Sequence, residues 1–192
     1  MEDAISFIKK SIKESADSKI EFITQSENIA NASKIITDSM KKGGKLLICG
    51  NGGSAADSQH IAGELIDKFL IERKGLPAIA LTTDTSVLTA WGNDKNFDEI
   101  FERQIEALGK AEDVLLAIST SGNSKNILKA AEKAKEIGMK VISLTGGNGG
   151  ILKNLSDINI NSPSDKTPRI QECHMVAYHI ICQLVEEEMK DY

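Results

Sequence analysis

Short apolar runs alternate along the chain with longer segments in which apolar residues recur at helical spacing. The apolar runs are typical of buried strands, and five of them follow the N-terminal region, at 46–49, 78–81, 114–119, 140–144 and 158–160. Helical segments fall between these runs, and the segment 169–190 after the last run is predicted to be one long helix. Strands that alternate with helices predict an α/β fold, a doubly wound, five-stranded parallel sheet with helices on both faces.

Two further amphipathic segments, 2–25 and 27–42, precede the first strand. Ser26 is expected to cap the second of these helices, and Gly43 is expected to end it. The helices would either cover the sheet or pack against another subunit, and the pattern alone leaves both open. Because no linker interrupts the chain, we expect one domain over 1–192, with a helical pair at 1–43 and an α/β core at 44–192.

Turn-forming residues set the limits of the shorter elements. Asp84 or Ser86 is expected to cap a short helix that Gly92 and the two residues after it would break. Pro163 and Pro168 are expected to bracket a loop before the last helix.

Composition narrows the class of protein. The 192 residues are 41% hydrophobic and 27% charged, with a formal net charge of −5 and no basic block, which argues against a large nucleic-acid surface. No apolar run approaches the roughly 18 residues that a membrane span requires, and the N-terminus does not resemble a secretion signal. The three cysteines lie in apolar contexts, which suggests buried thiols in a reducing compartment, so we expect a cytoplasmic protein. Together with the charge and hydropathy, this predicts no nucleic-acid or membrane partner.

The segment 45–65, KLLICGNGGSAADSQHIAGEL, is the most informative stretch of the chain. It predicts a strand, a tight glycine-rich loop and a helix, with Ser54 as the N-cap. Glycines allow a ligand to approach the backbone, and the free N–H groups of a helix start attract an anion such as phosphate. Further along this helix, His60 and Glu64 lie on one face, where they could act in acid–base chemistry or bind a metal.

The segment LLICGNGGS is partly repeated as LAISTSGNS after the third strand, so that Gly52 matches Gly122 and Ser54 matches Ser124. Both loops would open at the carboxyl edge of the sheet, where ligands of such folds bind. The hydroxyl groups of the second loop suit a phosphate monoester, and they belong to Ser119, Thr120, Ser121 and Ser124. One such serine-rich turn is more often structural, but two at matched positions favour a ligand.

Nucleotide motifs fit less well. The letters GNGGSA match a variant of the dinucleotide fingerprint, but the acidic residue expected at the end of the second strand is missing. The first loop also lacks the lysine of a nucleotide P-loop. We therefore expect no nucleotide cofactor.

Four motifs, GNGGSAADSQH, LLAISTSGNS, SLTGGNGG and RIQECHMVAYH, together resemble the sugar isomerase (SIS) fold and most closely its phosphoheptose isomerases. The resemblance extends over about 29–189. It implies the conversion of sedoheptulose 7-phosphate into D-glycero-D-manno-heptose 7-phosphate, the first step towards the activated heptoses of bacterial surface polysaccharides. It also implies a cytoplasmic homotetramer with sites between subunits, which would give the N-terminal helices a partner.

Moving a carbonyl group between C2 and C1 requires a base for a carbon-bound proton and a group that shuttles protons on the oxygens, through an enediol-like intermediate. By resemblance, Glu64 is the base and His179 is its partner acid or base. The resemblance further implies a divalent metal, usually zinc, held by His60, Glu64, Gln171 and His179. Gln171 and His179 would point roughly 80° apart around their helix, and glutamine is an uncommon zinc ligand. The residues leave open whether the metal is catalytic.

The resemblance assigns the remaining substrate contacts, and His174 is expected only to support them. Gln171 is expected to contact substrate as well as metal. Contacts to the sugar and its phosphate are expected from Asn51, Gly52, Gly53, Ser54, Asn93, Asp94, Ser119, Thr120, Ser121 and Ser124.

Three other interpretations remain. A similar SIS branch is non-enzymatic and binds the bacterial replication initiator DnaA as a tetramer, but that branch is not expected to retain the counterparts of Glu64 and His179. The chain could also be an isomerase of another phosphosugar, or a sugar-phosphate sensor, although it has no DNA-binding extension.

Overall fold

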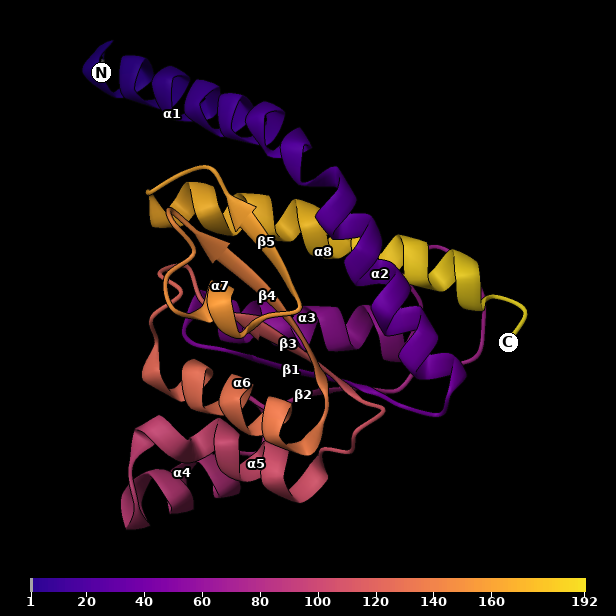
Figure 1. The fold of residues 1–192 in the computed structure, drawn as a ribbon. Coiled ribbons are helices and arrows are strands. Elements are labelled where there is room, and N and C mark those ends of the chain that lie inside the picture. Colours follow the sequence, from indigo (N-terminus) through magenta and orange to yellow (C-terminus); the bar gives the residue numbers. More distant parts are fainter. Residues whose placement is uncertain (1) are drawn as a thin grey trace.

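A computed structural model describes residues 2–192 and contains one five-stranded sheet (Figure 1). The strands are β1 (Leu46–Gly50), β2 (Ala78–Ala80), β3 (Val114–Ile118), β4 (Lys140–Gly146) and β5 (Ile158–Ser162). All pairings are parallel and the order is β2-β1-β3-β4-β5, which confirms the predicted doubly wound α/β class. The strand order reverses between β1 and β3, and ligands of such sheets bind in the crevice at that point.

Helices cover both faces of the sheet. Every residue of β1 and β3 is therefore buried. One core joins Leu46 and Ile48 of β1 to α2 (Ser26–Lys41), α3 (Gly53–Ile66) and α8 (Thr167–Met189). The other joins Leu47 and Cys49 to α4 (Thr85–Asp94), α5 (Ile100–Leu108), α6 (Lys125–Ile137) and the short α7 (Leu152–Leu155). In Figure 1, α8 and α2 lie on one side of the sheet and α4, α5 and α6 lie on the other.

The N-terminal region forms a nearly continuous helical arm in place of two capped helices. Helix α1 (Glu2–Glu21) passes through a 3₁₀ turn, η1 (Phe22–Gln25), directly into α2. The prediction that Ser26 caps α2 is wrong: its backbone is helical, and its hydroxyl donates to the Ile23 carbonyl at 2.6 Å. Gly43 follows the end of α2 with φ +83°, as expected. Helix α1 projects from the body of the molecule in Figure 1.

Two other predicted boundaries are wrong. Asp84 caps α4 as expected, but α4 runs through Gly92, Asn93 and Asp94 in place of breaking there. A single glycine costs a helix only about 1 kcal/mol, and the half-buried Trp91 packs this helix against the second core. Pro168 lies in the first turn of α8, where its missing N–H is tolerated, and not in the preceding loop. The 3₁₀ turn η2 (Phe97–Glu99) leads directly into α5, which ends before Gly109.

Helices α3 and α8 run side by side in the same direction. Contacts between them show this, since residues further along α3 meet residues further along α8. Gly53 meets Gln171 at the start, and His60 meets Tyr178 and His179 two turns later. Within residues 2–192, no helix is both long and apolar enough to cross a membrane.

Candidate active site

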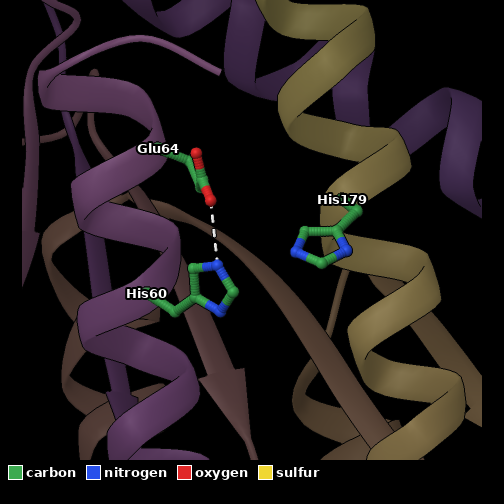
Figure 2. A group of neighbouring side chains, drawn as sticks. All are labelled: His60, Glu64 and His179. Atoms are coloured by element: carbon green, nitrogen blue, oxygen red, sulfur yellow. Dashed lines mark hydrogen bonds and ion pairs between the residues drawn. The ribbon is translucent and has the colours of Figure 1, made fainter. Parts of the chain in front are cut away.

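Three side chains predicted to bind metal or catalyse converge between α3 and α8 (Figure 2). His60 and Glu64 lie one turn apart on α3, with His60 Nε2 2.8 Å from Glu64 Oε1. His179 faces them from α8, and one ligand atom from each of the three residues lies within 4.8 Å of the others. His60 is 42% exposed and Glu64 is 22% exposed, so small molecules can reach the group.

The buried phenol of Tyr178 connects this group to Asp57. Its hydroxyl lies 3.4 Å from Asp57 Oδ1 and 3.1 Å from His60 Nδ1. The single hydroxyl proton, donated to Asp57, leaves the oxygen to accept the Nδ1 proton of His60. Burial, reinforced by the Asp57 charge, raises the pKa of Tyr178, so the phenol keeps its proton. The other ring nitrogen of His60, Nε2, faces the Glu64 carboxylate.

The donor set fits a zinc ion. Two imidazoles and one carboxylate, with a coordination position left open, are ligands that catalytic zinc sites use. Gln171 lies elsewhere along α8: its half-buried amide packs against Gly53, and eight residues of helix place it about 12 Å along the axis from His179. A metal contact from Gln171 therefore stays a prediction, whereas the amide is placed beside the first glycine-rich loop.

The first loop leaves β1 and enters α3 through a sharp turn. Gly52 has φ +55°, which favours glycine, and it takes the N-cap position with its carbonyl accepting from Ala55 N–H at 3.0 Å. The expectation that Ser54 caps this helix is wrong, because the helix begins two residues earlier than that cap would place it and Ser54 is buried in its first turn. Gly53 is exposed, so the N–H groups of this helix start can be approached from solvent.

A pair of amides joins the first loop to the second. Asn51 and Asn126 exchange two side-chain hydrogen bonds, at 2.9 and 2.8 Å. Asn126 belongs to the first turn of α6, and Gly50 of β1 is in register with Ile118 of β3. The two loops therefore start at the same level of the sheet and are tied across the crevice.

In the second loop, the hydroxyls are arranged around the start of α6. Ser119 and Ser124 share a hydrogen bond at 3.0 Å, and the exposed Ser121 accepts from Asn123 N–H at 3.2 Å. Thr120 is half-buried between them. The predicted phosphate residues of this loop are thus close together, while Gly122, at φ +65°, packs against Gly149 and Gly150, which follow β4.

Asn93 and Asp94 are not brought to this site. They lie exposed at the end of α4, where Asn93 donates to Asp94 at 3.0 Å. Helix α4 packs on α5 over the face of the sheet opposite α3 and α8 (Figure 1). Helix α4 belongs to the second core, whereas His60 and Glu64 lie on α3, which packs in the first core.

Sequence reasoning did not single out Asp57, Tyr178 or Asn126. Asp57 lies one turn before His60 on the same face of α3, which is a signal that helical spacing carries. Tyr178 directly precedes His179 in the chain, and no local pattern indicates its contact with His60. The pairing of Asn51 with Asn126 depends on strand order and had no local signal.

His174 joins α8 to the end of β4. Its buried ring donates from Nε2 to the Thr145 carbonyl at 2.9 Å, at the end of β4. Burial lowers the pKa of His174 to about 4, although that hydrogen bond opposes the shift. The ring is therefore neutral at pH 7 and fastens α8 to the sheet.

Comparison with known proteins agrees with this geometry. The SIS domain family matches residues 11–146. A phosphoheptose isomerase of Helicobacter pylori is 53% identical over 178 residues, which cover 93% of this chain and 90% of that protein. Another, of Clostridium acetobutylicum, is 52% identical over 95% of both chains. The structure of a phosphoheptose isomerase from Francisella tularensis superposes with a TM-score of 0.93 at 42% identity, over 96% of this chain and 98% of that one.

The chain therefore belongs to the SIS domain family, whose sheet and loops it shares over most of its length. Within that family it belongs to the phosphoheptose isomerases.

Proposed function

We propose that this protein converts D-sedoheptulose 7-phosphate into D-glycero-D-manno-heptose 7-phosphate through an enediol or enediolate, as an aldose–ketose isomerase. The observation that carries the proposal is the convergence of Glu64 and His179 beside His60, because this isomerisation needs one base and one acid–base partner in reach of adjacent carbons. The similarity to named phosphoheptose isomerases supports the choice of a heptose phosphate.

The proposed substrate lies along α3. Its phosphate is held by the N–H groups at Gly53 and by the hydroxyls of the second loop, including Ser121 and Ser124. His60 lies about 10 Å further along the α3 axis than Gly53. This span suits a sugar whose reacting carbons are at the opposite end of an extended chain from its phosphate.

At the reacting end, the free oxygen of the Glu64 carboxylate takes the proton from C1 of the ketose and returns it to C2. His179 donates to and accepts from the sugar oxygens, so that the proton on the C1 oxygen is lost as the C2 oxygen gains one. The Asp57–Tyr178 pair holds His60 in one tautomer, which keeps its Nε2 directed at the reacting end.

We propose that one zinc ion per subunit is bound by His60, Glu64 and His179, with Gln171 as a further ligand. When bound, zinc polarises the carbonyl group of the sugar and stabilises negative charge on its oxygen. The supporting observation is the donor set itself, in which His60 and Glu64 are already 2.8 Å apart.

We further propose that the protein works as a cytoplasmic homotetramer with sites between subunits. Helix α1 and the turn η1 that follows it expose large apolar side chains, which a second copy would cover: Ile5, Phe7, Ile8, Ile12, Ile20 and Ile23, each at least half exposed. Asn93 and Asp94, exposed at the end of α4, would then contribute to the site of another copy. The three buried cysteines are unpaired, as expected in a reducing compartment. The product would enter the synthesis of heptose-containing surface polysaccharides.

The alternatives make different predictions. A non-enzymatic protein that binds DnaA has no need of Glu64 and His179 in mutual reach, and their convergence therefore favours the enzyme. An isomerase of another phosphosugar would use the same residues, so only substrates can separate that reading.

The test is proton exchange into sedoheptulose 7-phosphate in deuterated buffer, followed by NMR. Wild type is expected to introduce deuterium and form the aldose, and Glu64→Gln is expected to abolish both. Glu72→Gln, at an exposed carboxylate that pairs with Lys68, is the matched control and should behave as wild type. Exchange into a five- or six-carbon ketose phosphate alone would refute the substrate but keep the reaction, whereas no exchange with any of them, with zinc added, would refute the isomerase.

A further inference from the structure

Glu186 is a fully buried carboxylate on α8, two turns after His179 and on the same face of the helix. It accepts three backbone N–H groups in succession, from Phe69 at 2.8 Å, Leu70 at 2.6 Å and Ile71 at 3.0 Å. Burial would raise the pKa of Glu186, but these hydrogen bonds and the Arg73 charge outweigh burial and hold the pKa below its usual value. The carboxylate is therefore ionised and binds the segment that follows α3.

Arg73 extends this connection back to the turn of α3 that carries Glu64. Its Nε lies 3.0 Å from Glu186 Oε1, in an ion pair whose side chains are both 0% exposed. The same guanidinium donates to the carbonyls of Glu64 and Leu65, both at 2.9 Å, where the C-terminal carbonyls of a helix lack partners. One buried pair of charges thus joins the Glu64 turn, the segment 69–71 and α8.

The segment held in this way places an aromatic ring on His179. The rings of Phe69 and His179 stack with their centroids 5.5 Å apart and their planes at 25°. On other sides, the imidazole meets Tyr178 and His60 edge to face. The Phe69 stack covers a face of the imidazole and so limits its rotation about the bond to Cβ.

We propose that Phe69 orients the His179 ring towards Glu64, and that Glu186 and Arg73 are positioning residues that hold Phe69 and the Glu64 turn in place. The proposal rests on the proposed function, in which Glu64 and His179 move the protons. In this arrangement Phe69, Glu186 and Arg73 do not touch the substrate. They act by fixing the positions of Glu64 and His179 relative to each other, on which the rate depends. Misplacing a reacting group by about 1 Å can cost a hundredfold in rate.

The first experiment reads the His179 ring directly, without substrate. A stacked aromatic ring shifts the imidazole protons upfield in the NMR spectrum, so Phe69→Leu is expected to lose this shift and Phe69→Tyr to keep it. Leu70→Ala is the matched control, because Leu70 is exposed on the same segment and its backbone N–H is retained. His179 resonances that are the same in wild type and Phe69→Leu would overturn the proposal.

The second experiment separates positioning from binding. Phe69→Leu is expected to lower kcat roughly tenfold or more with KM within about twofold of wild type, since the phosphate loops are untouched. Phe69→Tyr is expected to restore kcat. Values of kcat for Phe69→Leu equal to those of Leu70→Ala would overturn the proposal.

The buried charge pair is tested with Glu186→Gln, which is expected to lower kcat in the same way, against Glu187→Gln, an exposed neighbour that pairs with Lys190. If Glu186→Gln does not fold, the Phe69 variants still decide. If wild type isomerises no sugar phosphate, the proposed function fails, while the His179 resonances continue to decide whether Phe69 orients that ring.

Discussion

Lowering the pH from 7 to 5 is expected to destabilise the protein through His174. The ring is buried, its Nε2 donates to the Thr145 carbonyl, and its Nδ1 has no hydrogen-bond partner among residues 2–192. A second proton would have to be placed on that unpartnered nitrogen. The folded protein therefore binds it poorly, while the unfolded chain binds it at the ordinary pKa of the side chain.

The size of the effect follows from the pKa of His174, which falls from 6.5 to about 4 in the folded protein. Because the unfolded state binds the proton more tightly, stability is lost as the pH falls through 6.5 and the loss levels off below about 4. The full loss is about 3 kcal/mol, and about 2 kcal/mol of it occurs between pH 7 and pH 5.

The assay is urea unfolding of wild type and His174→Gln at both pH values, at one protein concentration and with metal chelated. The glutamine amide can still donate to Thr145 but does not titrate, and all other ionisable groups are common to the two proteins. Wild type should lose about 2 kcal/mol more than the variant between pH 7 and pH 5. Equal losses would show that His174 accepts its second proton in the folded state, and would refute the reasoning.

Three further outcomes are expected at the site. Tyr178→Phe should weaken zinc binding by about tenfold or more, because His60 loses the group that fixes its tautomer. A competition titration measures the affinity for zinc. Tyr192→Phe, at an exposed phenol, is the control and should bind zinc as wild type does. Replacing Ser121 and Ser124 together by alanine should raise KM about tenfold or more and change kcat little, since two phosphate hydrogen bonds of about 1 kcal/mol each are lost; an unchanged KM would contradict the phosphate assignment. Elemental analysis should find about one zinc per chain in wild type and none in His60→Ala, and a metal-free preparation with full activity would remove zinc from the mechanism.

Much of the fold could be predicted from local pattern. Strands buried on both faces appear as continuous apolar runs, so β1 and β3 were located to within a residue, and Gly43 follows the end of α2 as expected. The errors arose where packing outweighs a local signal. Gly92 does not end α4, because Trp91 is packed into the second core. Ser26 looks like a cap, but the helical arm continues through it.

The candidate site shows the same division. His60 and Glu64 could be paired from helical spacing alone, because they lie on one element. The approach of His179 depends on the parallel packing of α3 and α8, to which no local pattern points; it was expected only through the resemblance to a family. Phe69 and Glu186 were not identified at all, since their contacts join segments that lie far apart in the chain.

The parallel course of α3 and α8 has a mechanical consequence. The two helices are in contact at one end, where Gly53 packs against Gln171. At the other end they are joined by the buried ion pair of Glu186 and Arg73. Sliding of one helix past the other is opposed at both ends, so the two helices keep a fixed register along their axes. His60, Glu64 and His179 lie between the Gly53 contact and the buried ion pair, and Glu64 stands on the turn that Arg73 holds directly.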